Sequence, residues 1–431
     1  MKIGIISALA MTTSLIATPL TSADDLTEAL LAAFSSNPEL AAQRSALDAT
    51  AEGVKRARSG FFPSVNGQSS YSWASSKTGP TGYSPYIQSK SYSVSASQNI
   101  FSGFTTKNAV KAAKETLSAA EAQYRNTEQR IYLETVTAYL NVLRDEAVLN
   151  LNENQVRVLK RQYQAAKDRF QVGEITRTDV AQSQARLAGA ETQTAIARAN
   201  LAASRASYEQ VVGRAPGTLV NPEVLPELPP TLDEAISIGL AQNPLVHAAR
   251  ANEKAADYSV KQAKGGLLPS LSADIGWSRR ENDGQFFAGQ QFPSSITQTK
   301  SGGLTLSVPL YAGGARYSDI RRAKKVRSQR MHEIYAAERQ VQSQVTQAWD
   351  QLLAARSSIT STKSQVSANT IALDGVRQEA AVGSRTTLDV LDAEQELLNS
   401  EVNLVRAERD KFVAAYNLLS TMGYLTFGDP E

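Results

Sequence analysis

The sequence predicts a mixed α and β fold in which long antiparallel helical hairpins alternate with pairs of amphipathic strands. Three observations support this prediction: an internal repeat, two long proline-free stretches rich in helix-forming residues, and four segments in which apolar and small polar residues alternate. The repeat has a period of about 200 residues, far too long for a solenoid, and therefore indicates a duplicated half-molecule.

The repeat appears when residues 26–64 are aligned with residues 232–270 without a gap. Among the matching residues are Leu26 and Leu232, Glu28 and Glu234, Asn37 and Asn243, Pro38 and Pro244, Gly60 and Gly266, and Ser64 and Ser270. The offset between matching residues then rises from 206 to 210, the value at Gly103 and Gly313, and stays there. Because insertions fall in surface loops, we expect a longer loop between Ser270 and Tyr311.

The composition excludes several classes of protein. A net charge of +3, with 20% charged and 42% hydrophobic residues, is typical neither of a nucleic-acid binder nor of a disordered chain. The chain has no cysteine, which excludes disulfides, thiolate metal sites, a cysteine nucleophile and a lipid-anchoring cysteine. The two histidines, His247 and His332, lack metal-ligand spacing, and no nucleophile is paired with a base. We therefore expect no catalytic site and no cofactor.

The N-terminal residues 1–23 are predicted to be a secretory signal peptide. Lys2 supplies the positive start, residues 3–16 the apolar core, and Thr21-Ser22-Ala23 the cleavage site. The alternative is a buried N-terminal helix. No later window holds 18 apolar residues, so no transmembrane helix is expected.

Each half then opens on two helices. Asn37-Pro38 and Asn243-Pro244 are typical of an N-cap followed by proline at the first helical position. These pairs predict a short helix before each of them and a helix of about twenty residues after each of them. The second helix is expected to end near Gly60 in the first half and near Gly266 in the second.

Four strands are expected next, at about residues 62–74, 91–101, 269–279 and 301–311. One face of each is mainly apolar, and the other carries Ser, Thr, Asn, Asp and Gly. The residues of the first face are Val65, Tyr71, Trp73, Val94, Ala96, Gln98, Ile100, Leu271, Ala273, Ile275, Trp277, Leu304, Leu306, Val308 and Leu310. Such strands of about ten residues, with aromatic residues near their ends, are typical of transmembrane β-barrels. A soluble hairpin packed on a core is the alternative.

Four strands cannot close a membrane barrel, because such barrels begin at eight strands. An open sheet in lipid would leave unpaired backbone groups, so other copies of the chain are needed to close the sheet. Two copies would supply eight strands, and three copies would supply twelve and leave room for a pore. Cyclic assembly is the expected solution.

Long helical hairpins are predicted at about residues 104–213 and 314–423. A helix over residues 105–170 would be about 100 Å long, a length typical of coiled-coil packing. Glycine follows each long helix, at Val172-Gly173 and at Val382-Gly383, as expected for a left-handed C-cap. A Thr-x-x-Asp sequence then opens a returning helix, so that tips are expected near residues 173–178 and 383–386.

The predicted domain organisation follows from these elements. The signal peptide at 1–23 precedes a first repeat at 24–213, and a linker at 214–231 leads to the second repeat at 232–423. Residues 424–431 form a C-terminal tail.

The chain resembles the TolC-like outer-membrane efflux proteins over about residues 24–425. The duplicated layout, the Asn-Pro pairs and both Val-Gly tips carry this resemblance. Its most specific part is Val382–Ala393, which is similar to the family's second tip. Residues 169–173, with 178–180, are similar to the first tip.

The resemblance implies a homotrimer with a twelve-stranded β-barrel among the lipids of the outer membrane and a long α-helical barrel in the periplasm. It implies that a periplasmic adaptor and an inner-membrane RND pump or ABC exporter dock at the tips, Val172-Gly173 and Val382-Gly383. The implied function is an exit duct for drugs, small toxic compounds or proteins, with no nucleic acid as partner. Drug efflux and type I secretion share such a duct, so the sequence does not separate them.

The resemblance also implies roles for five residues at the periplasmic entrance. Asp389 and Asp392 would form the acidic rings of a pore constriction. Arg385 would hold the entrance closed through bonds to Asp179 and Thr178 of the neighbouring tip. Helix capping alone also explains Asp179 and Asp389, and this alternative stays open.

The internal repeat supplies a control for these roles. Arg385 and Asp392 have Ile175 and Gln182 as their counterparts in the first half. A hairpin therefore folds without these charges, which favours a role that the two halves do not share. Ala380 stands where the family often has tyrosine, so one closing bond is expected to be missing.

A soluble periplasmic coiled-coil adaptor or scaffold is the competing interpretation. Adaptors also contain long helical hairpins, but they lack two pairs of amphipathic strands with aromatic ends. The strands therefore favour the duct.

Overall fold

The computed structural model describes residues 25–75, 86–222, 224–283, 285–287 and 290–425. The predicted signal peptide and most of the predicted C-terminal tail lie outside the described residues, as do residues 76–85 of the first loop between strands. Long helical hairpins and a four-stranded antiparallel sheet make up the described chain, so the predicted mixed α and β class is confirmed.

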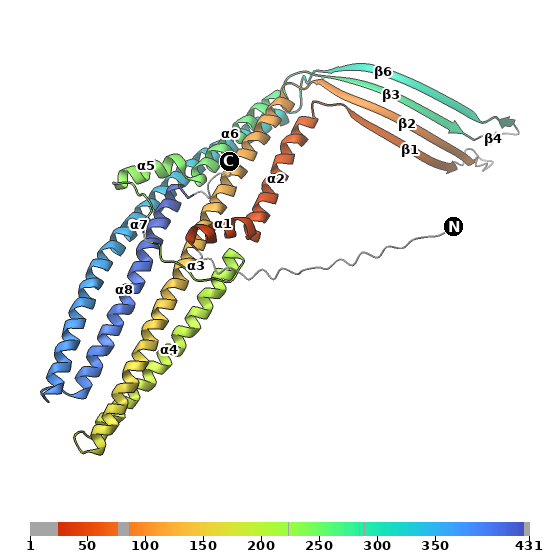
Figure 1. Cartoon of the computed structure of the whole chain (residues 1–431). Helices are drawn as coiled ribbons and strands as arrows, with labels where there is room; N and C mark the ends of the chain where they lie inside the picture. The colour runs from red at the N-terminus through yellow and green to blue at the C-terminus, as the bar shows by residue number, and fades with distance from the viewer. Residues whose placement is uncertain (1–24, 76–85, 223, 284, 288–289, 426–431) are drawn as a thin grey trace, which may run out of the picture. The chain divides into compact units, whose positions relative to one another are not determined.

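The two repeats form helices of equal length (Figure 1). The short helices α1 (Leu26–Ser36) and α5 (Leu232–Gln242) have 11 residues each. They are followed by α2 (Pro38–Ser59) and α6 (Pro244–Gly265), of 22 residues each. The long helices α3 (Thr105–Gln171) and α7 (Ala315–Ala381) have 67 residues, and the returning helices α4 (Arg177–Val212) and α8 (Thr387–Met422) have 36. Their bounds reproduce the offsets of the aligned sequences, 206 and then 210.

Matching contacts of the two Asn-Pro pairs also support the duplication. Asn37 Nδ2 donates to the carbonyl of Val211 at 3.1 Å, and Asn243 Nδ2 donates to the carbonyl of Thr421 at 2.8 Å. Asn243 Oδ1 also accepts the backbone N–H of Leu245 at 2.8 Å, which is the predicted N-cap. Each asparagine thus ties the start of one helix to the end of another.

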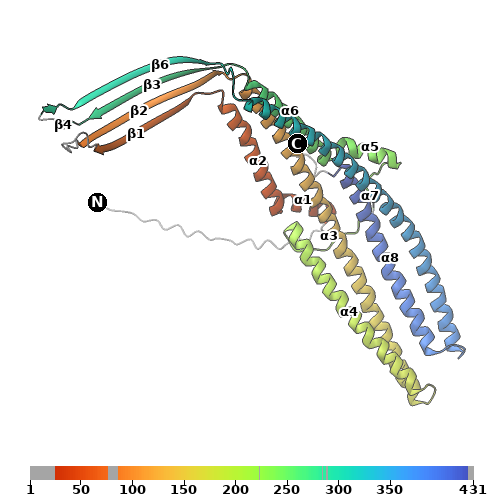
Figure 2. The ribbon, with the colours of Figure 1, turned by 180° about the vertical axis from the view of Figure 1, so that it is seen from behind.

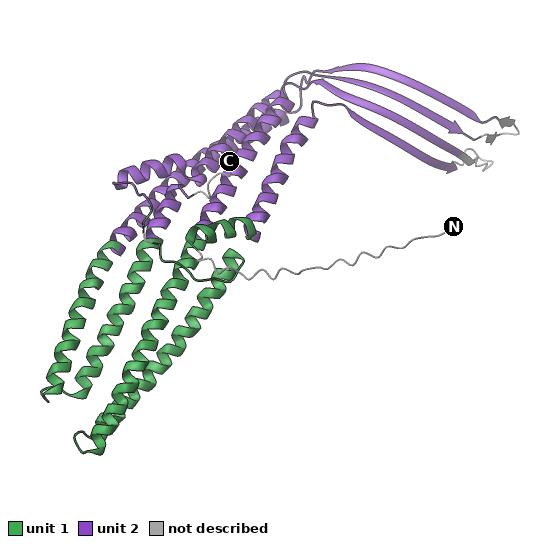
Figure 3. Cartoon of the chain, in the orientation of Figure 1, with its two compact units in different colours: residues 1–37, 134–226, 356–413 green, residues 38–133, 227–355, 414–431 purple. Residues whose placement is uncertain are grey.

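The chain divides into two compact units that do not coincide with the repeats (Figure 3). Unit 1 comprises residues 1–37, 134–226 and 356–413, and unit 2 comprises residues 38–133, 227–355 and 414–431. Both units contain segments of both repeats, because α3, α7 and α8 each contribute residues to the two units. The repeats therefore describe the order of elements along the chain, whereas the units describe packing.

Unit 1 contains two antiparallel helix pairs. Arg198 and Arg205 of α4 form ion pairs with Glu153 and Glu146 of α3, at 3.0 Å and 2.6 Å. Between the other two helices, Asn369 Nδ2 of α7 donates to the carbonyl of Glu396 of α8 at 3.1 Å. Arg377 of α7 also pairs with Glu394 of α8, at 3.0 Å. In both helix pairs the contacting residues run in opposite directions along the two helices, so each long helix turns and returns as predicted.

The sheet belongs to unit 2 and has the order β1-β2-β3-β6 (Figure 2). Its antiparallel strands are β1 (Ser64–Ser75), β2 (Tyr86–Phe101), β3 (Ser270–Asn282) and β6 (Ser295–Ser307). A small ribbon, β4 (Gln285–Phe287) with β5 (Gln290–Phe292), forms in the longer loop and was not expected.

One strand ends before its predicted limit. Strand β6 stops at Ser307, although Val308 and Leu310 continue the alternating pattern. Pro309 explains this end, because proline has no backbone N–H to donate to a neighbouring strand.

The strand register places most of the predicted apolar residues on one face of the sheet. The exceptions are Ile100, where a bulge puts Phe101 opposite Leu271, and Val308 and Leu310, which lie beyond β6. Val65 lies opposite Ala96, Ala96 opposite Ile275, and Ile275 opposite Gly302. Directly opposed residues share a face of an antiparallel sheet, so the apolar sets of the four strands form one surface. The adjacent row, Asn66, Ser95, Gly276 and Ser301, lies on the polar face.

None of the helices in the described part of the chain is both long enough and apolar enough to cross a membrane.

Candidate functional site

The two hairpin tips have the same backbone geometry. The glycines are left-handed, with φ of 79° at Gly173 and 80° at Gly383. No atom lies within 4 Å of a Cβ added at either position, so the backbone conformation, and not crowding, requires glycine. The preceding valines, Val172 and Val382, are 79% and 81% exposed. Large apolar side chains exposed at both tips are available to a partner.

Each returning helix begins with the same cap. Thr176 and Asp179 form a reciprocal capping box at the start of α4, and Thr386 and Asp389 repeat it at the start of α8. In both boxes the threonine hydroxyl donates to the aspartate carboxylate at 2.7 Å. The same hydroxyl oxygen accepts the backbone N–H of the aspartate at 3.3 Å. Capping is therefore a role that both aspartates perform in this chain.

Hydrogen bonds within the two caps lower the pKa of both aspartate carboxylates. The hydroxyl of Thr176 is the main cause of a lowered pKa of Asp179. The backbone N–H of Thr386 is the main cause of a lowered pKa of Asp389. Hydrogen bonds to the ionised form stabilise it, so both groups are charged at neutral pH.

The ion pairs at the two tips have reversed polarity. At the first tip Arg169 of α3 pairs with Glu174 at 2.6 Å. At the second tip Glu379 of α7, the counterpart of Arg169, pairs with Arg385 at 2.8 Å. These bonds lower the pKa of Glu174 and raise the pKa of Arg385. The tips are thus alike in backbone, but the matching residues Arg169 and Glu379 carry opposite charges.

The structure places Asp389 and Asp392 near the start of α8 but does not join Arg385 to the first tip. In the part of the chain that the structure describes, no ion pair joins Arg385 to Asp179, and Arg385 pairs with Glu379 of its own tip. Thr178 is exposed on the first turn of α4. The predicted closing contacts therefore remain a proposal about a neighbouring tip.

Sequence reasoning missed the partner of Asp392. Arg186 of α4 forms an ion pair with Asp392 of α8, and the two side chains are 40% and 53% exposed. The charges at these positions differ between repeats, because Arg186 corresponds to Glu396 and Asp392 to Gln182. These differences in charge between the repeats are visible in the sequence and could have drawn attention to both residues. Helical periodicity, however, does not show which helices face each other.

Glu394 is a second residue that the sequence did not reveal. It is 3% exposed, and its Oε1 accepts from Gln162 of α3 and from Arg377 of α7, the latter at 3.0 Å. One buried carboxylate on α8 therefore binds side chains of two other helices. Because removing a partner leaves a charge buried, such a site is sensitive to substitution.

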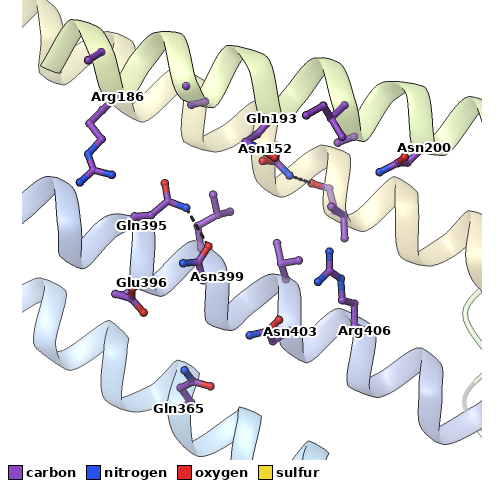
Figure 4. A pocket seen from close by; sticks show the side chains of 18 residues that line it. Asn152, Arg186, Gln193, Asn200, Gln365, Gln395, Glu396, Asn399, Asn403 and Arg406 are labelled. Atoms are coloured by element: carbon purple, nitrogen blue, oxygen red, sulfur yellow. Dashed lines mark hydrogen bonds between the residues drawn. The ribbon is translucent and has the colours of Figure 1, made fainter. Parts of the chain in front are cut away.

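A groove in unit 1 has seven amide side chains in its lining, beside apolar and charged ones (Figure 4). Its volume is about 850 Å³. The amide side chains that line it are Asn152, Gln193, Asn200, Gln365, Gln395, Asn399 and Asn403. The only charged side chains in its lining are Arg186, Glu396 and Arg406. The described residues contain no cluster of three side chains suited to a metal ion.

The sheet exposes its apolar face. Val65, Trp73, Ile275, Leu304 and Leu306 are between 64% and 70% exposed. Single exposed apolar residues are common on soluble proteins, but a whole strand-spanning face is not. The opposite face carries small polar side chains, including the hydrogen-bonded pair Ser70 and Ser91, at 2.7 Å. A sheet with one apolar and one polar face matches the wall of a membrane barrel.

Duplicated helical hairpins and such a sheet define a class of outer-membrane protein with a large periplasmic part. The model of the outer membrane efflux protein family matches residues 30–214 and 235–424. The chain belongs to this family. It is accordingly an outer-membrane protein and not an enzyme.

Individual relatives agree with this assignment. The chain is 34% identical to the outer membrane efflux protein BepC of Brucella suis, over 94% of this chain and 86% of that one. It is 27% identical to the outer membrane protein TolC of Escherichia coli, over 95% of this chain and 84% of that one. Among solved structures, CusC has a TM-score of 0.79 at 18% identity and covers 92% of both chains, a likeness that concerns the fold alone.

Proposed function

We propose that the chain is the outer-membrane exit duct of a tripartite efflux pump or type I secretion system. The observation that carries this proposal is the two-faced sheet of β1, β2, β3 and β6. Its apolar face suits lipid, and its polar face suits a water-filled interior. Membership of the efflux family supports the same function.

The duct is a homotrimer in this proposal. Within the described sheet, β1 and β6 are the edge strands, and an open edge in lipid leaves backbone N–H and C=O groups unpaired. Three four-stranded sheets close into twelve strands when β6 of one chain pairs with β1 of the next. Twelve strands leave an open interior, whereas the interior of an eight-stranded barrel fills with side chains.

The tips are the proposed docking surfaces for a periplasmic adaptor and an inner-membrane RND pump or ABC exporter. The exposed side chains of Val172 and Val382 and the reversed ion pairs beside them support this part of the proposal. The opposite charges of the matching residues Arg169 and Glu379 let a partner distinguish the two tips.

The periplasmic entrance is proposed to lie at the second tip. Asp389 and Asp392 form its constriction, and Arg385 closes it through Asp179 and Thr178 of a neighbouring tip. The presence of Arg385 and Asp392 in only one of the two repeats supports this role. The pairing of Arg186 with Asp392 adds a cation that the acidic ring must accommodate.

Fractionation and bilayer recording together test the proposal. The protein should sediment with the outer membrane, cross-link as three copies, and give discrete conductance steps in planar bilayers. A stable monomer in lipid, or a protein recovered in the soluble periplasmic fraction, would contradict the duct. The soluble fraction is the outcome expected of an adaptor, but the exposed apolar face of the sheet does not suit that alternative.

A further inference from the structure

Basic residues gather where the helices of unit 2 meet the sheet. Four helix segments adjoin the strands there: residues 52–59, 105–115, 257–265 and 315–325. Their basic side chains are Lys55, Arg56, Arg58, Lys107, Lys111, Lys114, Lys261, Lys264, Arg316, Arg321, Arg322, Lys324 and Lys325, which we call the junction belt. The same segments contain four acidic residues, Glu52, Glu115, Asp257 and Asp319. With a net charge of only +3 for the whole chain, this concentration is not a consequence of composition.

These segments converge at one end of the sheet (Figure 2). A Cβ added at Gly60, after α2, would lie 2.9 Å from the Thr106 side chain of α3. A Cβ at Gly103, before α3, would lie 2.3 Å from the Gly265 carbonyl of α6. Lys111 of α3 also lies over the ring of Tyr258 of α6, 5.3 Å from its centroid. The belt therefore belongs to one packed junction and not to separate surfaces.

A groove opens within this belt between α3, α6 and α7. Its volume is about 760 Å³. Its polar lining consists of Thr105, Ser259, Gln262, Arg316, Asp319 and Arg322. Alanines and Val326 supply the apolar part of the lining. Two guanidinium groups suit a phosphate, and the apolar part suits the carbon atoms attached to it. The hydroxyls of Thr105 and Ser259 already donate to the carbonyls of Ser102 and Ala255, at 2.7 Å and 3.0 Å, so the arginines are the donors left for a phosphate.

The cations in the groove are available to a ligand. Arg322 contacts Asp319 at 3.2 Å, but both side chains of that pair are largely exposed, at 79% and 59%. Exposed pairs of this kind are weak and exchange readily. By contrast, Arg327 is bound to Glu253 at 2.8 Å and to Asp257 at 3.1 Å, so we do not include it among the ligands.

The position of the groove favours lipid over free phosphate. Exposed aromatic side chains lie at the junctions between the helices and the strands, among them Phe61, Phe62, Phe104 and Tyr311. Aromatic residues collect at the boundary between lipid and water, and Lys and Arg beside a membrane segment attract anionic headgroups. The belt lies on the helical side of this boundary, which is the periplasmic side of the proposed duct.

We propose that this groove binds the headgroup of an anionic phospholipid of the periplasmic leaflet, with Arg316 and Arg322 as the phosphate ligands. The inference rests on the proposed function for the side of the membrane on which the groove lies. It adds a lipid site to the duct.

Native mass spectrometry of the detergent-solubilised full-length assembly tests the site. Dioleoyl-phosphatidylglycerol and dioleoyl-phosphatidylcholine are titrated separately, and bound lipid is counted per chain. We expect phosphatidylglycerol to bind more tightly, with a preference that weakens at high salt. The double variant Arg316→Gln/Arg322→Gln should lose roughly fivefold in affinity for each arginine. The matched control Arg330→Gln/Arg339→Gln removes the same charge from α7, farther from the sheet, and should keep the preference.

Each other outcome overturns the inference in an identifiable way. Equal retention of the two lipids, or equal losses in the test and control variants, would mean that the groove is not a headgroup site. Full competition by millimolar inorganic phosphate would identify a free-phosphate site instead. An assembly that dissociates in Arg316→Gln/Arg322→Gln without lipid would show that a second copy covers the groove. Failure of the unmodified protein to assemble at all would instead count against the proposed function.

Discussion

Arg186 of α4 forms an ion pair with Asp392 of α8, so a side chain of the first hairpin is bound to a side chain of the second. Both side chains are about half exposed, and such pairs contribute less than about 1 kcal/mol to stability. The pair matters more for the charge of the proposed constriction than for the stability of the fold, because it places a positive charge beside a carboxylate of that constriction. Asp392 is therefore not an isolated acid in this chain.

The first prediction concerns ion selectivity. Asp392→Asn should lower the cation-over-anion permeability ratio, because Arg186 is then left without its carboxylate. One unit charge at about 8 Å in water changes a local ion concentration by about twofold, and a trimer repeats the effect. The double variant Arg186→Gln/Asp392→Asn should return to the unmodified ratio, since both charges are gone. Reversal potentials in a salt gradient across planar bilayers measure this ratio.

A matched control is available on the same helix. Arg198 of α4 pairs with Glu153 of α3 at 3.0 Å, within the first hairpin. Arg198→Gln should leave the ratio near that of the unmodified channel. If Arg186→Gln/Asp392→Asn conducts like Asp392→Asn alone, Arg186 does not act at the entrance.

The second prediction concerns the faces of the sheet. Ile275→Arg should impair assembly, because an arginine on the lipid face of a barrel costs about 2–4 kcal/mol at the bilayer midplane. Ser95→Arg is the control, since Ser95 lies opposite Gly276, the residue after Ile275, on the polar face. Heat-modifiable mobility in gels and the yield of cross-linked trimer measure assembly. Equal damage by the two arginines would contradict the assignment of the faces.

Helices could be predicted from the sequence where a capping residue next to the helix end fixes that end. Gly173 and Gly383 end the long helices, and the Thr-x-x-Asp sequences open the returning ones, so both tips were predicted within a few residues. Alternation with a period of two residues predicted the faces of the regular strands, but not the bulge between Asn99 and Phe101, where the period is interrupted. The early end of β6 was missed, although Pro309 was a sufficient reason for it.

Contacts between helices that lie far apart along the chain could not be predicted from the sequence. Arg186 and Asp392 lie far apart along the chain, and Glu394 meets Gln162 of α3 and Arg377 of α7. Periodicity identifies the buried stripe of a helix but not the helix against which that stripe packs. The duplication predicted equivalent elements, but the contacts that distinguish the repeats arise where the two sequences differ.

The third prediction concerns the caps and pH. The pKa of Asp179 is lowered in the folded chain, mainly by the Thr176 hydroxyl. The stabilisation by this carboxylate is therefore complete above the ordinary aspartate value of about 3.9 and is lost as pH falls through the lower folded value. Asp179→Ala should speed amide exchange at the start of α4 at pH 7, and the difference from the unmodified protein should shrink as the pH falls below the ordinary aspartate pKa. Exchange measured by mass spectrometry at matched pH checks this.

Asp389 offers an internal comparison for that experiment. Its capping box has the same distances, and its pKa is lowered mainly by the Thr386 backbone N–H. If capping is its whole role, Asp389→Ala should change exchange at the start of α8 and leave ion selectivity unchanged. A loss of cation selectivity in Asp389→Ala would show that the carboxylate also acts in the pore.

The last prediction concerns the closed entrance. Arg385 is bound to Glu379 of its own tip at 2.8 Å, and its proposed second partner is Asp179 of a neighbouring tip. If the second contact closes the entrance, Arg385→Ala and Asp179→Ala should each raise single-channel conductance and admit larger antibiotics from outside. The double variant should resemble either single one, because the two residues form one contact. Three symmetric contacts opening together would amplify a small change at each of them.

The variant Glu379→Gln distinguishes a contact of Arg385 with the neighbouring tip from its contact within its own tip. It removes the partner of Arg385 within the tip but leaves Arg385 free to reach Asp179, so conductance should stay low or fall further. If Arg385 only orders its own tip, Glu379→Gln should raise conductance as much as Arg385→Ala does. Asp179→Ala also needs the comparison Thr176→Ala, which removes the hydroxyl of the same capping box and keeps the carboxylate. An increase in Asp179→Ala that Thr176→Ala does not reproduce assigns the closing contact to the carboxylate itself, because both variants weaken the cap and only one removes the charge.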